Sequence, residues 1–148
     1  MSLKEKLLQD MKEAMKKKET ERLSTIRMIR ASIKNSEIDL GRELSEEDVL
    51  GVLARGIKQR KDSFTQYTNA GREDLAAKEE KEIQILMSYL PEQATEEELE
   101  TRVREVIKET GASSQRDMGK VMKIIVSEFK GKADGGVINA IVKKSLNL

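Results

Sequence analysis

Apolar residues recur at helical spacing along almost the whole chain, and this periodicity constrains the fold more than any other feature. Its clearest instance is a stretch with apolar residues at Met118, Val121, Met122, Ile125 and Phe129. Steps of three and four residues place these side chains on one side of an α-helix, whereas a strand would alternate. The composition agrees, with 37% charged and 3% aromatic residues and one proline. The sequence therefore predicts an all-α fold.

The helices are expected to fall into two units. Apolar periodicity predicts helices over residues 2–17, 20–40, 46–70, 72–88 and 96–110, and a hairpin of two shorter helices over 117–146. Pro91 pushes Leu90 out of helical geometry, and the run Thr95–Glu98 has the capping-box pattern of a new helix. We therefore expect an N-terminal four-helix unit with long antiparallel helices, residues 1–90, and a small three-helix unit, residues 91–148.

Several kinds of chemistry have no residues to carry them. The chain has no cysteine and no histidine. These two residues are the commonest zinc ligands, cysteine is the usual thiol nucleophile, and histidine is the usual base at neutral pH. Neither Gly119-Lys120 nor Gly131-Lys132 has the spacing of a P-loop. The carboxylates fall in helix N-termini or on charged faces, with no spacing that marks an acid–base pair. We expect no catalytic residue, no metal and no cofactor.

The sequence also bears on location. No apolar run approaches the roughly 18 residues that span a membrane. The first residues, Met1–Lys6, lack the apolar core of a secretory signal. The absence of cysteine suits a reducing compartment. These features predict a cytoplasmic protein with no membrane partner.

A turn at residues 130–134 joins the two helices of the hairpin. Gly131 stands where a helix end favours positive φ, and Asp134 stands where the next helix requires an N-cap. Residues 111–148 carry seven Lys or Arg against three acids, a local charge of +4. The lysines of the hairpin are Lys120, Lys123, Lys130, Lys132, Lys143 and Lys144. They form either a phosphate-contacting surface or an ordinary solvated face, and helical amphipathicity alone favours the solvated face.

A secondary basic stripe lies on the second predicted helix. Arg27, Arg30 and Lys34 follow one another at i, i+3 and i+7 and so share a face. This row is either a surface that reads phosphate or a solvated row that pairs with acids of another helix. Pairing or solvation is the commoner case.

Gly119 interrupts the first helix of the hairpin. Glycine inside a helix costs up to about 1 kcal/mol relative to alanine. Its presence indicates close approach, either of a partner backbone or of a neighbouring helix, and we expect the neighbouring helix.

Two motifs of the hairpin carry a family resemblance. The run Met118–Met122, Met-Gly-Lys-Val-Met, followed by Lys130–Gly135, Lys-Gly-Lys-Ala-Asp-Gly, resembles the tail domain of the GatB subunit of glutamyl/aspartyl-tRNA amidotransferases. The whole chain resembles the small, free-standing YqeY family, which shares that tail. The remaining resemblance rests on residues 27–31, 58–63 and 89–93.

The resemblance implies tRNA as a ligand. Carried over to this chain, it implies that Lys120, Lys130 and Lys132 contact phosphate and that Gly131 and Gly135 shape the turn. It also implies an association with carbon–nitrogen ligases that use glutamine as amide donor. The part of GatB that activates and amidates the tRNA has no counterpart here.

Three functions follow as hypotheses. The first is a tRNA-binding accessory module with no catalytic centre of its own, which binds by shape and phosphate contact because two Tyr and two Phe form no stacking platform. The alternative is a protein–protein adaptor that docks helix faces onto an aminoacyl-tRNA synthetase or an amidotransferase. Exposed apolar residues on the helix over 46–70 would support it. A less favoured alternative is an independent amidotransferase-like enzyme, for which the sequence provides no nucleotide site or activated nucleophile.

Overall fold

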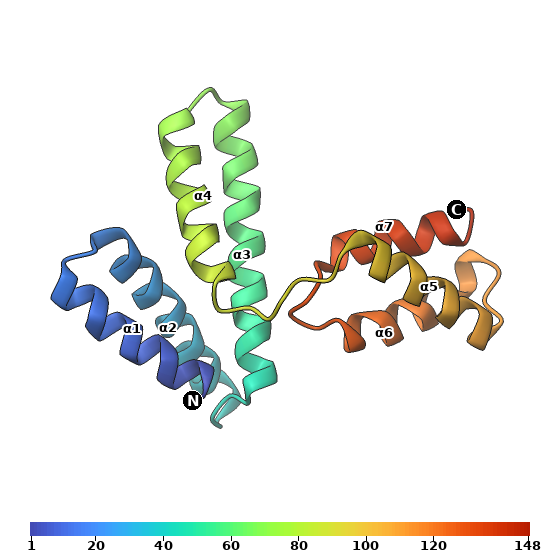
Figure 1. Ribbon diagram of the computed structural model, residues 1–148, viewed down its shortest axis with the longest axis horizontal. Helices are drawn as coiled ribbons and strands as arrows, with labels where there is room; N and C mark the ends of the chain where they lie inside the picture. The colour runs from blue at the N-terminus through green and yellow to red at the C-terminus, as the bar shows by residue number, and fades with distance from the viewer. The chain divides into compact units, whose positions relative to one another are not determined.

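The computed structural model describes all residues from 1 to 148 and contains seven α-helices and no strand. The all-α fold predicted from the periodicity is confirmed. The chain forms two compact units, Met1–Leu90 and Pro91–Leu148, each with its own core (Figure 1). No helix has both the length and the apolar character needed to cross a membrane.

The N-terminal unit consists of two helical hairpins. The helices are α1 (Leu3–Lys17), α2 (Thr20–Leu40), α3 (Glu46–Asn69) and α4 (Glu73–Met87). Helix α1 runs antiparallel to α2, and α3 runs antiparallel to α4 (Figure 1). Short connections enforce this pairing, since two or three residues between helices leave room only for a reversal.

A capping box begins α3. Ser45 Oγ accepts a hydrogen bond from Asp48 N at 3.1 Å, and Asp48 Oδ2 accepts one from Ser45 N at 3.1 Å. Arg42 Nη1 donates to the same oxygen of Asp48 at 2.9 Å. The hydrogen bond from Arg42, followed by those from Ser45, lowers the pKa of Asp48 to about 2. The start of α3 is therefore stabilised by an ionised carboxylate.

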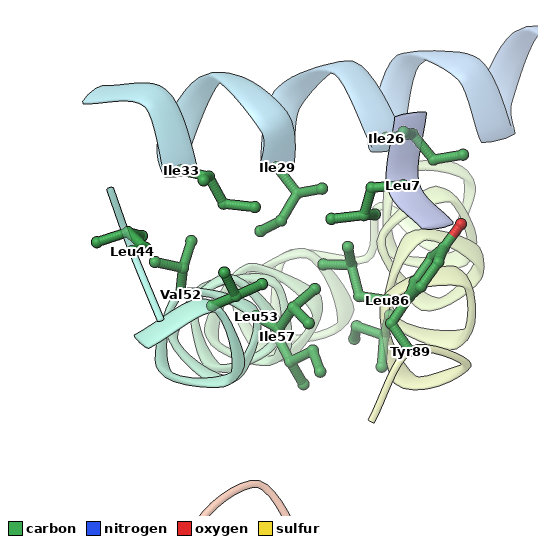
Figure 2. Close-up of a cluster of buried hydrophobic side chains, with 12 residues drawn as sticks. Leu7, Ile26, Ile29, Ile33, Leu44, Val52, Leu53, Ile57, Leu86 and Tyr89 are labelled. Carbon is green, nitrogen blue, oxygen red and sulfur yellow. The ribbon is translucent and has the colours of Figure 1, made fainter. Parts of the chain in front are cut away.

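All four helices contribute to one core. Figure 2 shows side chains of α2 facing those of α3 and α4 across the interior, with Leu44 at one end and Leu7 of α1 and Tyr89 at the other. The labelled residues are Leu7, Ile26, Ile29, Ile33, Leu44, Val52, Leu53, Ile57, Leu86 and Tyr89. Each fully buried aliphatic side chain contributes about 1.5–3 kcal/mol by leaving water.

Two large apolar residues of α2 lie outside its buried face. Met28 is 52% exposed and Ile38 is 69% exposed. Met28 follows Ile26 by about 200° around the helix, and Ile38 follows Ile33 by about 140°. Both residues therefore point away from the stripe that meets the core.

The C-terminal unit packs three helices around a second core. These helices are α5 (Glu96–Thr110), α6 (Met118–Glu128), which follows a 3-10 turn over Gln115–Asp117, and α7 (Gly135–Ser145). Thr95 Oγ1 accepts a hydrogen bond from Glu98 N at 3.1 Å and caps α5. The buried residues are Leu99, Val103, Val106, Val121, Ile125, Ile138, Ile141, Val142 and Leu146.

Candidate nucleic-acid interface

The turn between α6 and α7 has a defined backbone geometry. Gly131 has φ 76°, a conformation that side chains with a Cβ rarely adopt. Asp134 Oδ1 accepts a hydrogen bond from Gly136 N at 3.1 Å and caps α7. Gly135 is the first residue of α7, its φ is not positive, and a Cβ there would meet nothing within 4 Å. The geometry therefore requires glycine at position 131 and not at position 135.

The start of the C-terminal unit holds this turn in place. Gln93 Nε2 donates to Gly131 O at 2.8 Å, and Ala94 N donates to Lys132 O at 2.8 Å. Two consecutive residues thus fix two carbonyls of the turn. A turn fixed before a ligand arrives loses less conformational entropy on binding.

The hairpin lysines are exposed, and most have no partner in the chain. All six side chains are exposed to solvent. The side chains of Lys123, Lys132, Lys143 and Lys144 form no hydrogen bond or ion pair. The charge of Lys120 helps to lower the pKa of Asp117, although the hydrogen bond from the Ser113 N–H lowers it more.

The structure does not bring the six lysines to one point. Lys130 and Lys132 lie at the turn, and we call them the turn lysines. Helices α6 and α7 run in opposite directions (Figure 1), so Lys120, Lys143 and Lys144, the terminal lysines, lie toward the other end of the hairpin. Lys143 comes nine residues after Asp134, the N-cap of α7, which corresponds to a rise of about 14 Å along the helix. This distance exceeds a Debye length of about 8 Å at physiological salt, so the two groups attract separate charges.

The carboxylates nearest in sequence to these lysines are engaged elsewhere. Asp117 Oδ2 accepts from Ser113 N at 3.0 Å, and Asp134 caps α7. Arg102 of α5 binds both oxygens of Glu128 at 2.7 Å, which lowers the pKa of Glu128. All three acids of residues 111–148 therefore have partners other than the hairpin lysines.

The secondary basic stripe lines a groove between α1 and α2. Arg27, Arg30 and Lys34 border a cavity of about 550 Å³ together with Lys4. Lys4 is paired with Glu37 at 2.6 Å. No carboxylate pairs with the three residues of the stripe, and Arg30 Nη1 contacts only the Met11 thioether, at 3.2 Å. Of the two commoner cases, pairing with acids of another helix is therefore not observed.

One sequence-based expectation is corrected here, and one hypothesis lacks a feature that would support it. Gly119 is exposed, and a Cβ there would meet nothing within 4 Å, so the expected close helix packing is wrong. Exposed apolar residues on α3 would have supported the adaptor hypothesis, and no large apolar residue of α3 is exposed. Apart from the two terminal residues, the large apolar residues that are exposed are Met15, Met28, Ile38, Leu40, Val126 and Val137.

Sequence reasoning missed Gln93 and Arg102. Gln93 reaches Gly131 across 38 residues, and Arg102 reaches Glu128 across 26. Neither contact produces a periodic pattern in the amino-acid sequence. The nearest sequence clue is that Gln93 follows the helix-breaking Pro91 and stands outside any helix.

These features define a class: an all-helical protein of two units whose C-terminal hairpin carries uncompensated positive charge. The chain belongs to the YqeY family, since the family described as Yqey-like protein matches residues 4–146.

Fungal relatives support this assignment. The chain is 43% identical over 105 residues to "Altered inheritance of mitochondria protein 41, mitochondrial" of Kluyveromyces lactis and 38% identical over 104 residues to the protein of that name in Vanderwaltozyma polyspora. Both matches cover 68% of this chain and 56% of the relative. The protein of that name in Pyrenophora tritici-repentis is 32% identical over 130 residues, 86% of this chain and 71% of the relative. The chain thus spans little more than half of the length of the first two relatives.

The relatives contradict the predicted cytoplasmic location. Each of them is named as a mitochondrial protein. The prediction rested on the absence of cysteine and of a membrane-spanning run. The absence of cysteine restricts redox chemistry, and the absence of an apolar run restricts membrane insertion. Neither absence distinguishes one aqueous compartment from another.

Proposed function

We propose that this protein is an RNA-binding accessory module, with tRNA as its expected ligand, and that the α6–α7 hairpin contacts the phosphate backbone. The observation that supports the proposal most strongly is that Lys123, Lys132, Lys143 and Lys144 are exposed without a carboxylate partner, while the acids of residues 111–148 are engaged elsewhere. By its resemblance to the GatB tail, the module is associated with glutamine-dependent amidation of tRNA and does not perform that chemistry itself.

The aromatic residues restrict how RNA is bound. Tyr89 is buried, and Phe64, Tyr67 and Phe129 are partly buried. They offer no exposed row of rings on which unpaired bases could stack. Affinity then comes from phosphate and shape, and it falls steeply as salt rises.

The two lysine groups have different parts in this proposal. The turn lysines project from a backbone that Gln93 and Ala94 hold in place, so they meet a phosphate at a fixed position. The terminal lysines lie about 14 Å away and contact a different phosphate. The Arg27, Arg30 and Lys34 stripe supplies a secondary contact in the N-terminal unit.

Paired alanine substitutions test this assignment. Lys130→Ala/Lys132→Ala and Lys143→Ala/Lys144→Ala are each expected to weaken binding to bulk tRNA and to make the log–log salt slope shallower by about one to two. The matched control is Lys12→Ala/Lys16→Ala, which removes two exposed, unpaired lysines of α1. Equal weakening by the control pair would show a general charge effect and overturn the assignment to the hairpin.

A further inference from the structure

A small cavity between α2 and α3 is lined by polar side chains, none of which is acidic, and by the apolar Met28, Ile29 and Val52. Its volume is about 220 Å³. The polar lining residues are Ser32 and Ser36 of α2 and Arg55, Gln59 and Arg60 of α3. The cavity is smaller than the 300–1,000 Å³ typical of sites for drug-sized ligands. It suits a small, highly polar group.

Arg60 supplies a buried charge to this cavity. Only 8% of the surface of Arg60 is exposed to solvent. Nε donates to Glu82 Oε2 at 3.2 Å, and Nη1 donates to Gly56 O at 3.0 Å. The protein partner of Nη2 is the Met28 thioether at 3.9 Å, which is a weak and distant acceptor. This partly buried guanidinium nitrogen therefore lacks a protein oxygen to receive its protons.

The charges around the cavity leave one cation uncompensated. Glu82 pairs with Arg60. Arg55 is exposed and has no carboxylate partner. Glu79, the other α4 acid whose charge interacts with Arg60, does not line the cavity. An anion in the cavity would therefore face Arg55 without a competing carboxylate in its walls.

The neutral lining residues can act as donors. Ser36 and Gln59 make no side-chain hydrogen bond within the chain, so both are available. Ser32 Oγ donates to Met28 O at 3.2 Å and would have to leave this bond to donate to a ligand in the cavity. The hydroxyl and amide groups thus complement the two guanidinium groups.

Gly56 allows the two helices to approach at this point. A Cβ on Gly56 would lie 3.2 Å from Ile29 Cδ1 and 3.4 Å from Arg60 Nη1. A side chain at this position would crowd Ile29 and leave less room for the Arg60 guanidinium. Glycine therefore preserves the position of the buried guanidinium.

We propose that this cavity binds a phosphate group, held by Arg55 and Arg60 and by hydrogen bonds from Ser32, Ser36 and Gln59. Planar guanidinium groups match phosphate oxygens in geometry and charge, which favours them over a single ammonium. The phosphate is either free inorganic phosphate or the terminal monoester of a small molecule. The site lies within the N-terminal unit and does not depend on RNA binding by the hairpin.

The binding test uses the intact, ¹⁵N-labelled chain titrated at constant ionic strength. Inorganic phosphate and glycerol 3-phosphate are the probes, with sodium chloride and glycerol as controls. The amides of residues 32–36 and 55–60 are expected to shift saturably with phosphate groups and not with the controls. Tighter binding of glycerol 3-phosphate identifies a monoester as the ligand, and equal binding identifies the phosphate group itself. Absence of saturable shifts with either probe at tens of millimolar overturns the proposal.

Two variants examine the residues of the site. Arg55→Gln is expected to weaken phosphate binding by about tenfold, and Ser36→Ala by about threefold. The matched control Lys58→Gln removes a cation from the same exposed helix at a position that does not line the cavity. All three substitutions replace side chains with no partner in the chain, so the fold is expected to persist. Equal weakening by Lys58→Gln contradicts a built site.

Discussion

Gln93 Nε2 donates a 2.8 Å hydrogen bond to the carbonyl oxygen of Gly131, so the first residues of the C-terminal unit fix the turn that carries the turn lysines. The adjacent hydrogen bond from Ala94 N to Lys132 O also holds this turn in place. Together these contacts explain how an exposed turn can present its lysines at a defined position.

Replacing the Gln93 amide should loosen this turn. Gln93→Ala is expected to lower the free energy of unfolding by about 0.5–1 kcal/mol, because an exposed hydrogen bond contributes little more than that. Hydrogen exchange should accelerate at the amides of Lys132 and Ala133, which bond within the turn. Gln115→Ala, which removes an exposed amide without a side-chain hydrogen bond, is the control. Unchanged exchange in Gln93→Ala would show that the contact does not restrain the turn.

The buried ion pair of the N-terminal unit should be sensitive to loss of one member. Arg60 and Glu82 are 8% and 9% exposed. Glu82→Ala leaves the guanidinium buried without its counter-ion and is expected to cost about 3 kcal/mol in a urea unfolding experiment. Glu80→Ala, on the exposed side of α4, should cost less than about 0.5 kcal/mol. Similar costs for the two variants would mean that the pair is solvated in solution.

Two glycines of α3 should respond in opposite ways to alanine. A Cβ at Gly51 meets nothing within 4 Å, so Gly51→Ala is expected to raise the free energy of unfolding by about 0.5–1 kcal/mol. A Cβ at Gly56 lies 3.2 Å from the Cδ1 of Ile29, which is only 2% exposed and has little room to move. Gly56→Ala should therefore be at least about 1 kcal/mol less stable than Gly51→Ala. Thermal unfolding of both variants measures this, and equal stabilisation contradicts the close approach of α2 and α3.

The α3 capping box should make stability depend on acid pH. The pKa of Asp48 is lowered from 3.8 to about 2, so its stabilising effect is complete above pH 3.8 and disappears as pH falls toward 2. The stability difference between the natural chain and Asp48→Asn should shrink over this window, measured by urea unfolding between pH 5 and pH 2. Asp39→Asn, exposed and without an ion pair, serves as the control. A difference that stays constant with pH would show that the charge of Asp48 is not what stabilises the cap.

Local signals were enough to predict the helices. The segment 46–70 was expected to be helical, and α3 spans Glu46–Asn69, because Ser45 caps one end and apolar periodicity continues to the other. The predicted helix over 96–110 coincides with α5, which Thr95 and Gly111 delimit. Caps and stops act within a few residues, so a single sequence contains them.

The sites depend on contacts that a single sequence does not contain. Arg60 and Glu82 interrupt apolar patterns and look like exposed charges, and only the register between α3 and α4 buries them together. The spacing of Arg27, Arg30 and Lys34 predicted a shared face. Whether acids of another helix neutralise that face depended on how α1 packs beside α2. The packing places Glu5 of α1 in the same groove but forms no ion pair between it and the stripe.

The most direct test of the account is the binding of fluorescently labelled bulk tRNA to the intact chain, followed by anisotropy between about 50 and 200 mM salt. Four unpaired hairpin lysines predict a dissociation constant in the micromolar range or tighter at low salt, with a log–log slope of about −3 to −4. No binding at about 50 mM salt, or binding that does not change with salt, would contradict the proposal that this hairpin is a phosphate-contacting surface.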